Sequence, residues 1–250
     1  MRSLKDISGG LSLQAVADKY GLPYEDAKAA VEGAISDALS GIFHLDVECQ
    51  MNGQGCEIYV FRSTGVERLP TGRLKKNIFR AIKYSIVSAL NMETVTHGYE
   101  KSRYLAGGIA GGRIIAVHED RIFVELDTET VNCAPGGLAG VCELAHQTPK
   151  ERGRYRPGDY MNFHVLSIKT SLNGRVPALK ASLSRTSRGL TEGLLRRRLT
   201  ERLLNTQIHC VKRAVGVFSL VEANARIPGE CIKAVSDELK ERVIVHFVQK

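Results

Sequence analysis

The sequence contains no apolar run that approaches the roughly 20 residues a helix needs to cross a bilayer. Residues 1–10 also lack the apolar stretch of a secretory signal peptide. Hydrophobic residues make up 43% of the chain and charged residues 25%, which is ordinary for a globular protein. We therefore expect a cytoplasmic protein with no membrane partner. Its 250 residues allow one large domain or two to three small ones.

Metal-binding signatures are also missing. The chain has six cysteines but no CxxC pair, and its seven histidines are scattered. Cytosolic thiols stay reduced, so free, buried cysteines are expected, and we predict neither a metal nor another cofactor. The cysteines are Cys49, Cys56, Cys133, Cys142, Cys210 and Cys231.

The sequence carries no recognisable signature of an enzyme. It has no P-loop, GxSxG, HExxH or paired-carboxylate pattern. The glycine-rich stretch 107–112 is not followed by the Lys-Ser/Thr of a phosphate-binding loop. We therefore expect a binding protein without catalytic activity.

Charge is distributed unevenly along the chain. Residues 146–215 contain 15 Lys or Arg and only 4 Asp or Glu, a net charge of +11, whereas residues 1–145 carry a net charge of −3. Within residues 1–60 the net charge is −5. This asymmetry favours a polyanionic partner for the basic segment and a different partner for the acidic one. A solvated basic surface is the alternative.

The first part of the chain has the pattern of a small α+β unit. Apolar spacing predicts two helices within residues 12–40, interrupted at 21–23, and a third helix over 73–92. Alternating residues predict a β-hairpin over 42–51 and 56–62. We assign these elements to a domain spanning residues 1–105.

Short strands follow a glycine-rich stretch, 107–112, that we interpret as a hinge. Five strands are predicted at 112–117, 121–126, 140–144, 159–166 and 178–183, which fits a small OB-type barrel over residues 106–188. A basic helix at 189–205, strands at 207–213 and 217–223, a helix at 229–240 and a strand at 242–247 complete residues 189–250. The expected fold class is therefore α+β with several domains.

Two stretches of sequence carry a resemblance to a known family. The hairpin Val117–Leu126, the step Arg156-Pro157-Gly158-Asp159 and the closing Leu183-Ser184-Arg185-Thr186 resemble the S1 RNA-binding domain of the NusA family of transcription elongation and termination factors. Residues 225–245 resemble the second half of that family's first KH domain. The chain order, an N-terminal α+β domain, then S1, then KH, is also the order of the NusA family.

The chain departs from the family in its KH-like part. The family's Gly-x-x-Gly loop, in which glycine allows close approach to the nucleic-acid backbone, is here Arg226-Ile227-Pro228-Gly229. One KH-like unit stands where the family has two. The resemblance thus implies a shortened and divergent relative. The missing first glycine leaves open whether this loop clamps nucleic acid as the family's loop does, and Arg226 is a candidate for direct contact with phosphate instead.

The resemblance implies that the protein regulates transcription elongation, termination or antitermination. The barrel, basic helix and KH-like unit would hold nascent single-stranded RNA, and the N-terminal domain would dock RNA polymerase. Two alternatives remain open. One is an S1–KH subunit of an RNA-decay or ribosome-associated assembly, and the other is an adaptor that binds only protein.

Candidate RNA-binding residues combine aromatic groups that stack on bases with basic groups that contact phosphate. Tyr160 and Phe163 lie on opposite faces of one strand, so at most one of them faces RNA. For each candidate the structural alternative is a core aromatic, a solvated cation or an ion pair. The candidates are Phe123, His146, Lys150, Arg152, Arg154, Tyr155, Arg156, Tyr160, Arg185, Arg196, Arg197, Arg198, Lys212, Arg213, Arg226, Gly229 and Lys233.

Overall fold

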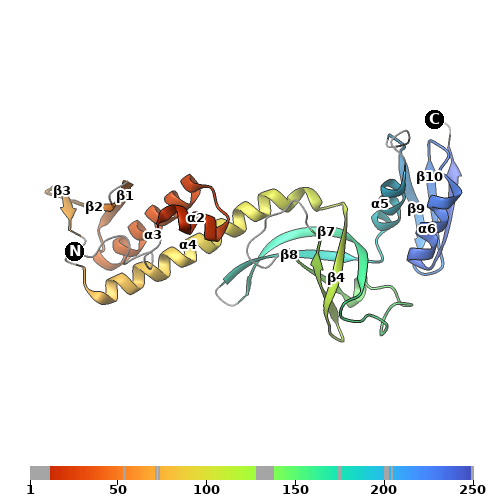
Figure 1. Cartoon of the computed structure of the whole chain (residues 1–250), viewed down its shortest axis with the longest axis horizontal. Coiled ribbons are helices and arrows are strands. Elements are labelled where there is room, and N and C mark those ends of the chain that lie inside the picture. Colours follow the sequence, from red (N-terminus) through yellow and green to blue (C-terminus); the bar gives the residue numbers. More distant parts are fainter. Residues whose placement is uncertain are drawn as a thin grey trace. The chain divides into compact units, whose positions relative to one another are not determined.

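A computed structural model of the chain describes residues 12–52, 55–70, 72, 74–127, 138–173, 176–199, 203 and 205–248. The chain divides into two compact units (Figure 1). Of the described residues, the first unit comprises those up to Glu100 together with those within 170–178, and the second unit comprises the remainder. No helix in the described ranges is both long enough and apolar enough to cross a membrane.

Helices α2 (Leu13–Tyr20) and α3 (Tyr24–Phe43) open the first unit, as the apolar spacing predicts. The Ser12 hydroxyl caps α2 by accepting a hydrogen bond from the Ala15 amide. Gly21 ends α2 in the left-handed conformation with φ 64°, which glycine adopts without steric cost. The two predicted helices at 12–40 are therefore confirmed.

An antiparallel sheet follows in the order β1-β2-β3, with β1 at Asp46–Asn52, β2 at Gly55–Arg62 and β3 at Gly65–Leu69. The predicted start of the hairpin at residue 42 is wrong, because α3 continues to Phe43 and His44 ends it with a positive φ. Strand β3 was not predicted. Its first four residues are exposed, so it lacks the apolar alternation of a half-buried strand.

Helix α4 (Lys76–Ser102) is longer than the predicted 73–92. The core of the first unit is aliphatic and draws on helices and sheet alike, because each element contributes only one apolar face. Its most deeply buried side chains include Ile35 and Leu39 of α3, Ile58 of β2, and Ile82 and Leu90 of α4.

Five strands close into a barrel in the order β4-β5-β6-β8-β7 (Figure 1), and all of it except residues 170–178 belongs to the second unit. They are β4 (Ile109–Val117), β5 (Arg121–Leu126), β6 (Ala139–Glu143), β7 (Tyr160–Asn173) and β8 (Val176–Ser184). β6 pairs with β8 in parallel, whereas β4–β5, β5–β6 and β4–β7 are antiparallel. This barrel is compatible with an OB-like fold and confirms the five predicted strands.

The glycines 111 and 112, interpreted from sequence as part of a hinge, lie instead inside β4. A Cβ atom at Gly111 would collide with the Tyr160 side chain, and one at Gly112 would lie 2.6 Å from a methyl of Val124. These glycines let side chains of neighbouring strands lie directly against the β4 backbone.

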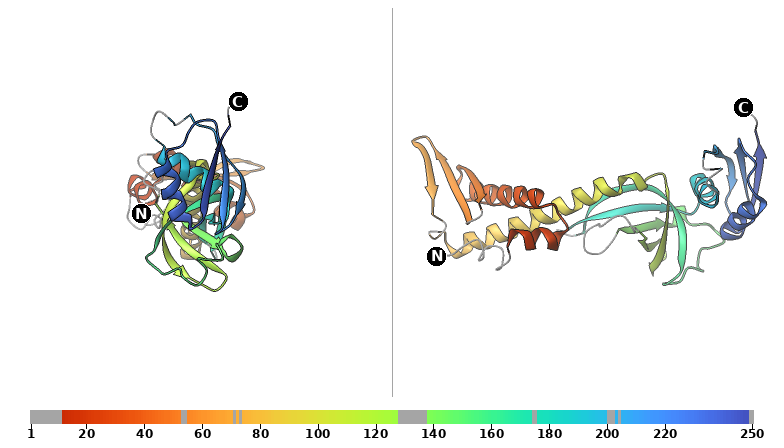
Figure 2. Two further views of the ribbon diagram at one scale, coloured as in Figure 1. Left: turned by 90° about the vertical axis from the view of Figure 1, so that its right-hand side faces the viewer. Right: turned by 45° about the horizontal axis from the view of Figure 1, so that its top comes forward.

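The C-terminal module, residues 188–247, consists of α5 (Arg188–Arg198), β9 (Ile208–Ala214), β10 (Phe218–Ala223), α6 (Gly229–Leu239) and β11 (Arg242–Phe247). Its sheet has the order β11-β10-β9, and β10 is antiparallel to β9 and parallel to β11. Both helices pack on this sheet and on each other (Figure 2). Helix α5 ends earlier than predicted, because Leu199 turns to an extended conformation that places its side chain in the core.

The five cysteines in the described residues are free thiols, as predicted. Three of them are buried, and Cys56 and Cys231 are half-buried. Cys133 lies outside the described residues.

Candidate nucleic-acid interface

A groove of about 520 Å³ lies in the C-terminal module between the loop after β10, helix α6 and strand β11. Most of its lining is apolar, and Arg226 supplies the positive charge. Phe247, at the end of β11, exposes 57% of its surface. The groove is lined by Ala225, Arg226, Ile227, Gly229, Ile232, Val245 and Phe247.

Local backbone structure builds one wall of this groove. Pro228 is the N-cap of α6, and Gly229 is its first residue. Ile227 is buried and anchors the loop in the core of the module, while Arg226 and Gly229 stay exposed on either side. A Cβ at Gly229 would meet nothing within 4 Å, so the groove is open at that point. Of the predicted residues, Arg226 and Gly229 line the groove, whereas Lys233 is exposed but not part of the lining.

The three consecutive arginines at the end of α5 point to three different partners, because successive helical residues are rotated by about 100°. The Arg196 guanidinium donates to the Ile208 carbonyl at 2.9 Å. Arg197 donates to the side-chain oxygen of Asn162 at 2.9 Å, and Arg198 pairs with Glu238 at 3.3 Å. All three side chains remain exposed, so their contacts leave donors that a phosphate can reach.

Asn162 and Glu238 join the barrel to the C-terminal module within the second unit. The Asn162 amide on β7 donates to the Glu238 carboxylate on α6 at 2.9 Å. Arg197 and Arg198 add their hydrogen bonds to this pair from α5. This cluster contains two exposed guanidiniums and one carboxylate, so it carries a net positive charge.

The barrel presents a second candidate surface on β4, β5 and the turn between them. The half-buried Phe123 ring makes an edge-to-face contact with His118, with ring centroids 5.4 Å apart. Ile115 and Val117 are exposed on the neighbouring strand. This combination offers aromatic and aliphatic surface for a base to stack on.

Tyr160 and Phe163 lie on opposite faces of β7, as the strand period predicts. Tyr160 is 56% exposed and pairs in register with the exposed Arg113 of β4. Phe163 is fully buried in the barrel. Tyr160 is therefore the aromatic residue of this strand that solvent and a ligand can reach.

The basic loop 146–156 separates into structural and exposed residues. The Tyr155 hydroxyl is buried and donates to Glu151 at 3.0 Å, and burial raises the pKa of Tyr155 above its usual value. The His146 carbonyl accepts from the Arg185 amide at 2.8 Å.

Four basic residues of this loop and Lys212 of β9 remain at the surface. Lys150 donates to the Gly216 carbonyl, and Arg152 donates to that of Leu144 at 2.8 Å. The ammonium of Lys212 lies 6.0 Å from the centre of the Phe218 ring. The exposed basic residues of this region are Lys150, Arg152, Arg154, Arg156 and Lys212.

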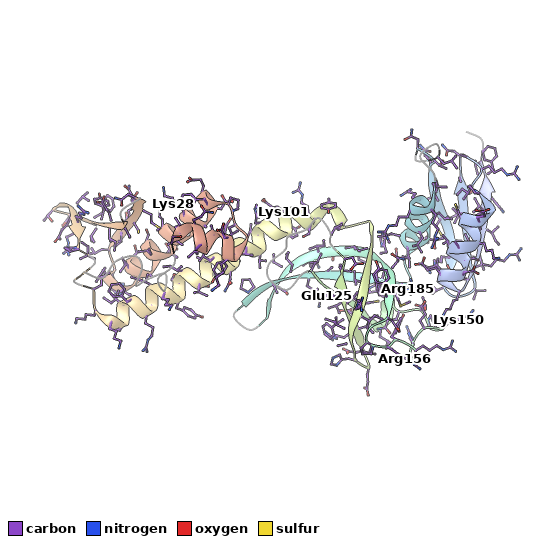
Figure 3. The ribbon with its side chains drawn as sticks, viewed as in Figure 1. Lys28, Lys101, Glu125, Lys150, Arg156 and Arg185 are labelled. Carbon is purple, nitrogen blue, oxygen red and sulfur yellow. The ribbon has the colours of Figure 1, made fainter. Side chains whose placement is uncertain are left out.

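Arg185 and Arg213 lie in the interior. Each forms an ion pair, which was the structural alternative to RNA contact. Arg185 lies at the barrel (Figure 3). It is fully buried and makes two hydrogen bonds to Glu151, at 2.6 and 3.1 Å. It also donates to the Asn162 carbonyl at 2.8 Å. Arg213 pairs in the same way with the buried Glu241, at 2.8 and 3.3 Å. Neither guanidinium faces solvent, so neither offers donors to RNA in this structure.

The electrostatics of the Arg185 site follow from burial and pairing. Burial alone disfavours the charged form of Glu151, but the hydrogen bonds and charge of Arg185 outweigh that cost and lower the pKa of Glu151. The same partner raises the pKa of Arg185 against the opposing effect of burial. Both groups therefore stay charged inside the protein.

Sequence reasoning missed five residues of the groove lining, namely Ala225, Ile227, Ile232, Val245 and Phe247. A signal for Phe247 was present, because alternation along β11 places it on the same face as the buried Val243. The sequence could not show that this face continues past the edge of α6 into an open groove.

No protein-family model matches the chain, and a search of curated proteins finds no match. Within the described residues, no group of three or more His, Cys, Asp or Glu side chains is placed to hold a metal ion.

Proposed function

We propose that the protein binds single-stranded RNA through the groove of its C-terminal module and the exposed face of its barrel. The observation that carries this proposal is the groove itself, with apolar residues along its lining, an exposed aromatic ring at Phe247 and a cation at Arg226. Single-strand sites combine these features, because bases stack on apolar and aromatic surface while cations contact the phosphates. Duplex recognition relies instead on a helix or ribbon inserted in a groove of the nucleic acid.

The C-terminal module is, in this proposal, a divergent KH-like domain, and the barrel is an S1-type domain. The helix–strand–strand–helix–strand order of residues 188–247 supports the first assignment, since α6 and β11 coincide with the stretch that resembles a KH domain. Arg226 replaces the first glycine of the loop. An extended arginine there contacts phosphate by charge, where the family's loop uses close backbone approach.

The wider role follows from joining this RNA interface to the acidic first unit. We propose that the first unit docks RNA polymerase and that the protein regulates elongation, termination or antitermination. Two weak interactions in one chain raise the effective concentration of nascent RNA near the polymerase. The acidic charge of residues 1–60 disfavours RNA contact and so supports a protein partner for this unit.

Fluorescence anisotropy of the full chain with a labelled single-stranded RNA, repeated across salt concentrations, tests the RNA interface. We expect salt-dependent binding that duplex DNA competes for poorly. Phe247→Ala should weaken binding by about 1–3 kcal/mol, or roughly 5- to 150-fold, because one stacked base loses its partner. Phe61→Ala, a partly exposed aromatic of the first unit, is the matched control and should leave affinity unchanged.

The outcomes separate the RNA proposal from its alternatives. No binding at low salt would reject it and favour an adaptor that binds only protein. Co-purification of the full chain from cells addresses the partner of the first unit. Recovery of RNA polymerase subunits supports the transcription role, whereas nuclease or ribosomal proteins without polymerase would point to a decay or ribosome-associated assembly.

A further inference from the structure

Two cysteines meet on one face of the sheet in the first unit. Cys49 lies on β1 and Cys56 on β2, and their sulfur atoms are 2.6 Å apart. In the strand register Cys49 faces Ile58 and Cys56 faces Met51, so the two cysteines are diagonal neighbours on the same face. A disulfide has an S–S bond of about 2.05 Å. Bond formation therefore requires only a small side-chain movement and no change of register.

The surroundings of the two thiols differ, which gives them different chemical roles. Cys49 is 3% exposed and lies under α3, where its amide donates to the Ser36 hydroxyl at 2.9 Å. Cys56 is half-buried and so within reach of a small reagent. The hydrogen bond from Cys49 lowers the pKa of Cys56 against the opposing effect of burial, while the same bond and burial raise the pKa of Cys49. The thiolate is therefore favoured at the accessible position.

We propose that Cys49 and Cys56 form a reversible oxidation site whose oxidant is a peroxide. The Cys56 thiolate attacks one peroxide oxygen, the O–O bond breaks, and Cys56 becomes a sulfenic acid while the other oxygen leaves as water after taking a proton. Cys49 then attacks the Cys56 sulfur, the S–O bond breaks, and the oxygen leaves as a second water. Two thiols and one hydrogen peroxide thus give one disulfide and two water molecules. A dithiol reductant reverses the change by thiol–disulfide exchange.

The disulfide would tie β1 covalently to β2, which are otherwise joined by backbone hydrogen bonds. Cys49 belongs to the core that the sheet shares with α3 and α4, so the cross-link would form at the edge of this core. This site lies entirely in the first unit, and its chemistry is independent of RNA binding.

Mass spectrometry of the full chain after brief peroxide treatment tests the site directly. Both cysteines lie in one tryptic peptide, residues 29–62, because no Lys or Arg occurs between Lys28 and Arg62. We expect this peptide to lose the mass of two hydrogen atoms and to regain it with dithiothreitol. The alkylation rate of Cys56 in untreated protein should exceed that of the half-buried Cys231 by at least about tenfold.

Single substitutions distinguish the role of Cys56, which reacts with peroxide, from that of Cys49, which then forms the disulfide. Cys49→Ser should stop the reaction at the sulfenic acid, so that peptide 29–62 gains one oxygen and becomes reactive toward dimedone. Cys56→Ser should prevent the loss of two hydrogens altogether, whereas the control Cys231→Ser should behave like the unaltered protein. The proposal fails if the unaltered peptide keeps both thiols while Cys231 is oxidised, or if its cysteines gain oxygen without forming the cross-link. Because these outcomes are measured on the unaltered protein, they hold even if a serine variant does not fold.

Discussion

The two units of this chain differ in whether they bury arginine–carboxylate pairs, although the second unit also has exposed ones such as Arg198–Glu238. In the described part of the first unit, the ion pairs Arg62–Glu67 and Arg68–Glu57 lie at the surface, over an aliphatic core. The second unit buries Arg185–Glu151 and Arg213–Glu241 almost completely. Buried charges require both a partner and further hydrogen bonds, and both pairs have them. A high count of basic residues therefore overstates the positive surface, since two arginines of the basic segment are paired in the interior.

The largest effect should come from breaking a buried pair. Glu151→Gln leaves Arg185 charged and without its carboxylate in the interior, and we expect the unfolding free energy to fall by about 3–5 kcal/mol. Urea denaturation followed by circular dichroism measures the loss. Replacing both residues by leucine should cost less than Glu151→Gln alone, because no charge is then buried without a partner. An equal or greater cost for the double variant would show that the pair itself, and not the orphaned charge, determines stability.

A second effect concerns pH at the same pair. The pKa of Glu151 is lowered in the folded protein relative to its ordinary value of 4.5, so its pairing contributes fully to stability above about pH 4.5. This contribution is lost as pH falls below that value and through the lowered pKa. Thermal unfolding between about pH 6 and pH 3 should therefore show a steeper loss of stability for the unaltered protein than for Glu151→Gln. Parallel curves would mean that Glu151 does not contribute to acid unfolding.

A third effect concerns RNA binding, which should depend on exposed arginines of the second unit but not on those of the first unit. Replacing Arg196, Arg197 and Arg198 together by Ala should weaken RNA binding and reduce the salt slope by about two to three units, because each phosphate contact releases counterions. Arg62→Ala combined with Arg68→Ala in the first unit is the control and should leave the slope unchanged. An unaltered slope in the triple variant would exclude phosphate contact by the end of α5.

The smallest effect is expected for a surface pair of the first unit. Arg68→Ala removes an ion pair whose arginine side chain is 65% exposed, and solvent screens such pairs. We expect the unfolding free energy in urea to change by less than about 1 kcal/mol. A loss comparable to that of Glu151→Gln would remove the distinction between the two units.

The sequence allowed prediction of the helices and strands that bury one face, because burial of one face gives their apolar residues a regular spacing. The barrel strands alternate, as at β5, where Ile122, Val124 and Leu126 point inward. Strand β3 could not be predicted in this way, because nearly all of it is exposed. For Arg185 the sequence left both RNA contact and an ion pair open. It could not identify the partner, because Glu151 lies 34 residues earlier in the chain and only the folded barrel brings the two side chains together.

The candidate site was predicted in part. Arg226 and Gly229 were identified through the resemblance of their loop, and the structure places both in the groove lining. Ile232 and Val245 have no distinguishing sequence feature, because apolar residues on a helix and a strand normally belong to a core. Their role depends on where α6 stops covering the sheet, which is a property of tertiary packing.

Helix α6 also has a mechanical consequence. It begins at Gly229 beside the groove. Near its other end, the Glu238 carboxylate accepts a hydrogen bond from Asn162 of the barrel, and the Glu238 carbonyl oxygen accepts one from Arg185. At a rise of 1.5 Å per residue its 11 residues span about 16 Å. If the groove binds single-stranded RNA as proposed, tension on that RNA would be transmitted along α6 to the barrel through these side chains, in addition to the connecting backbone.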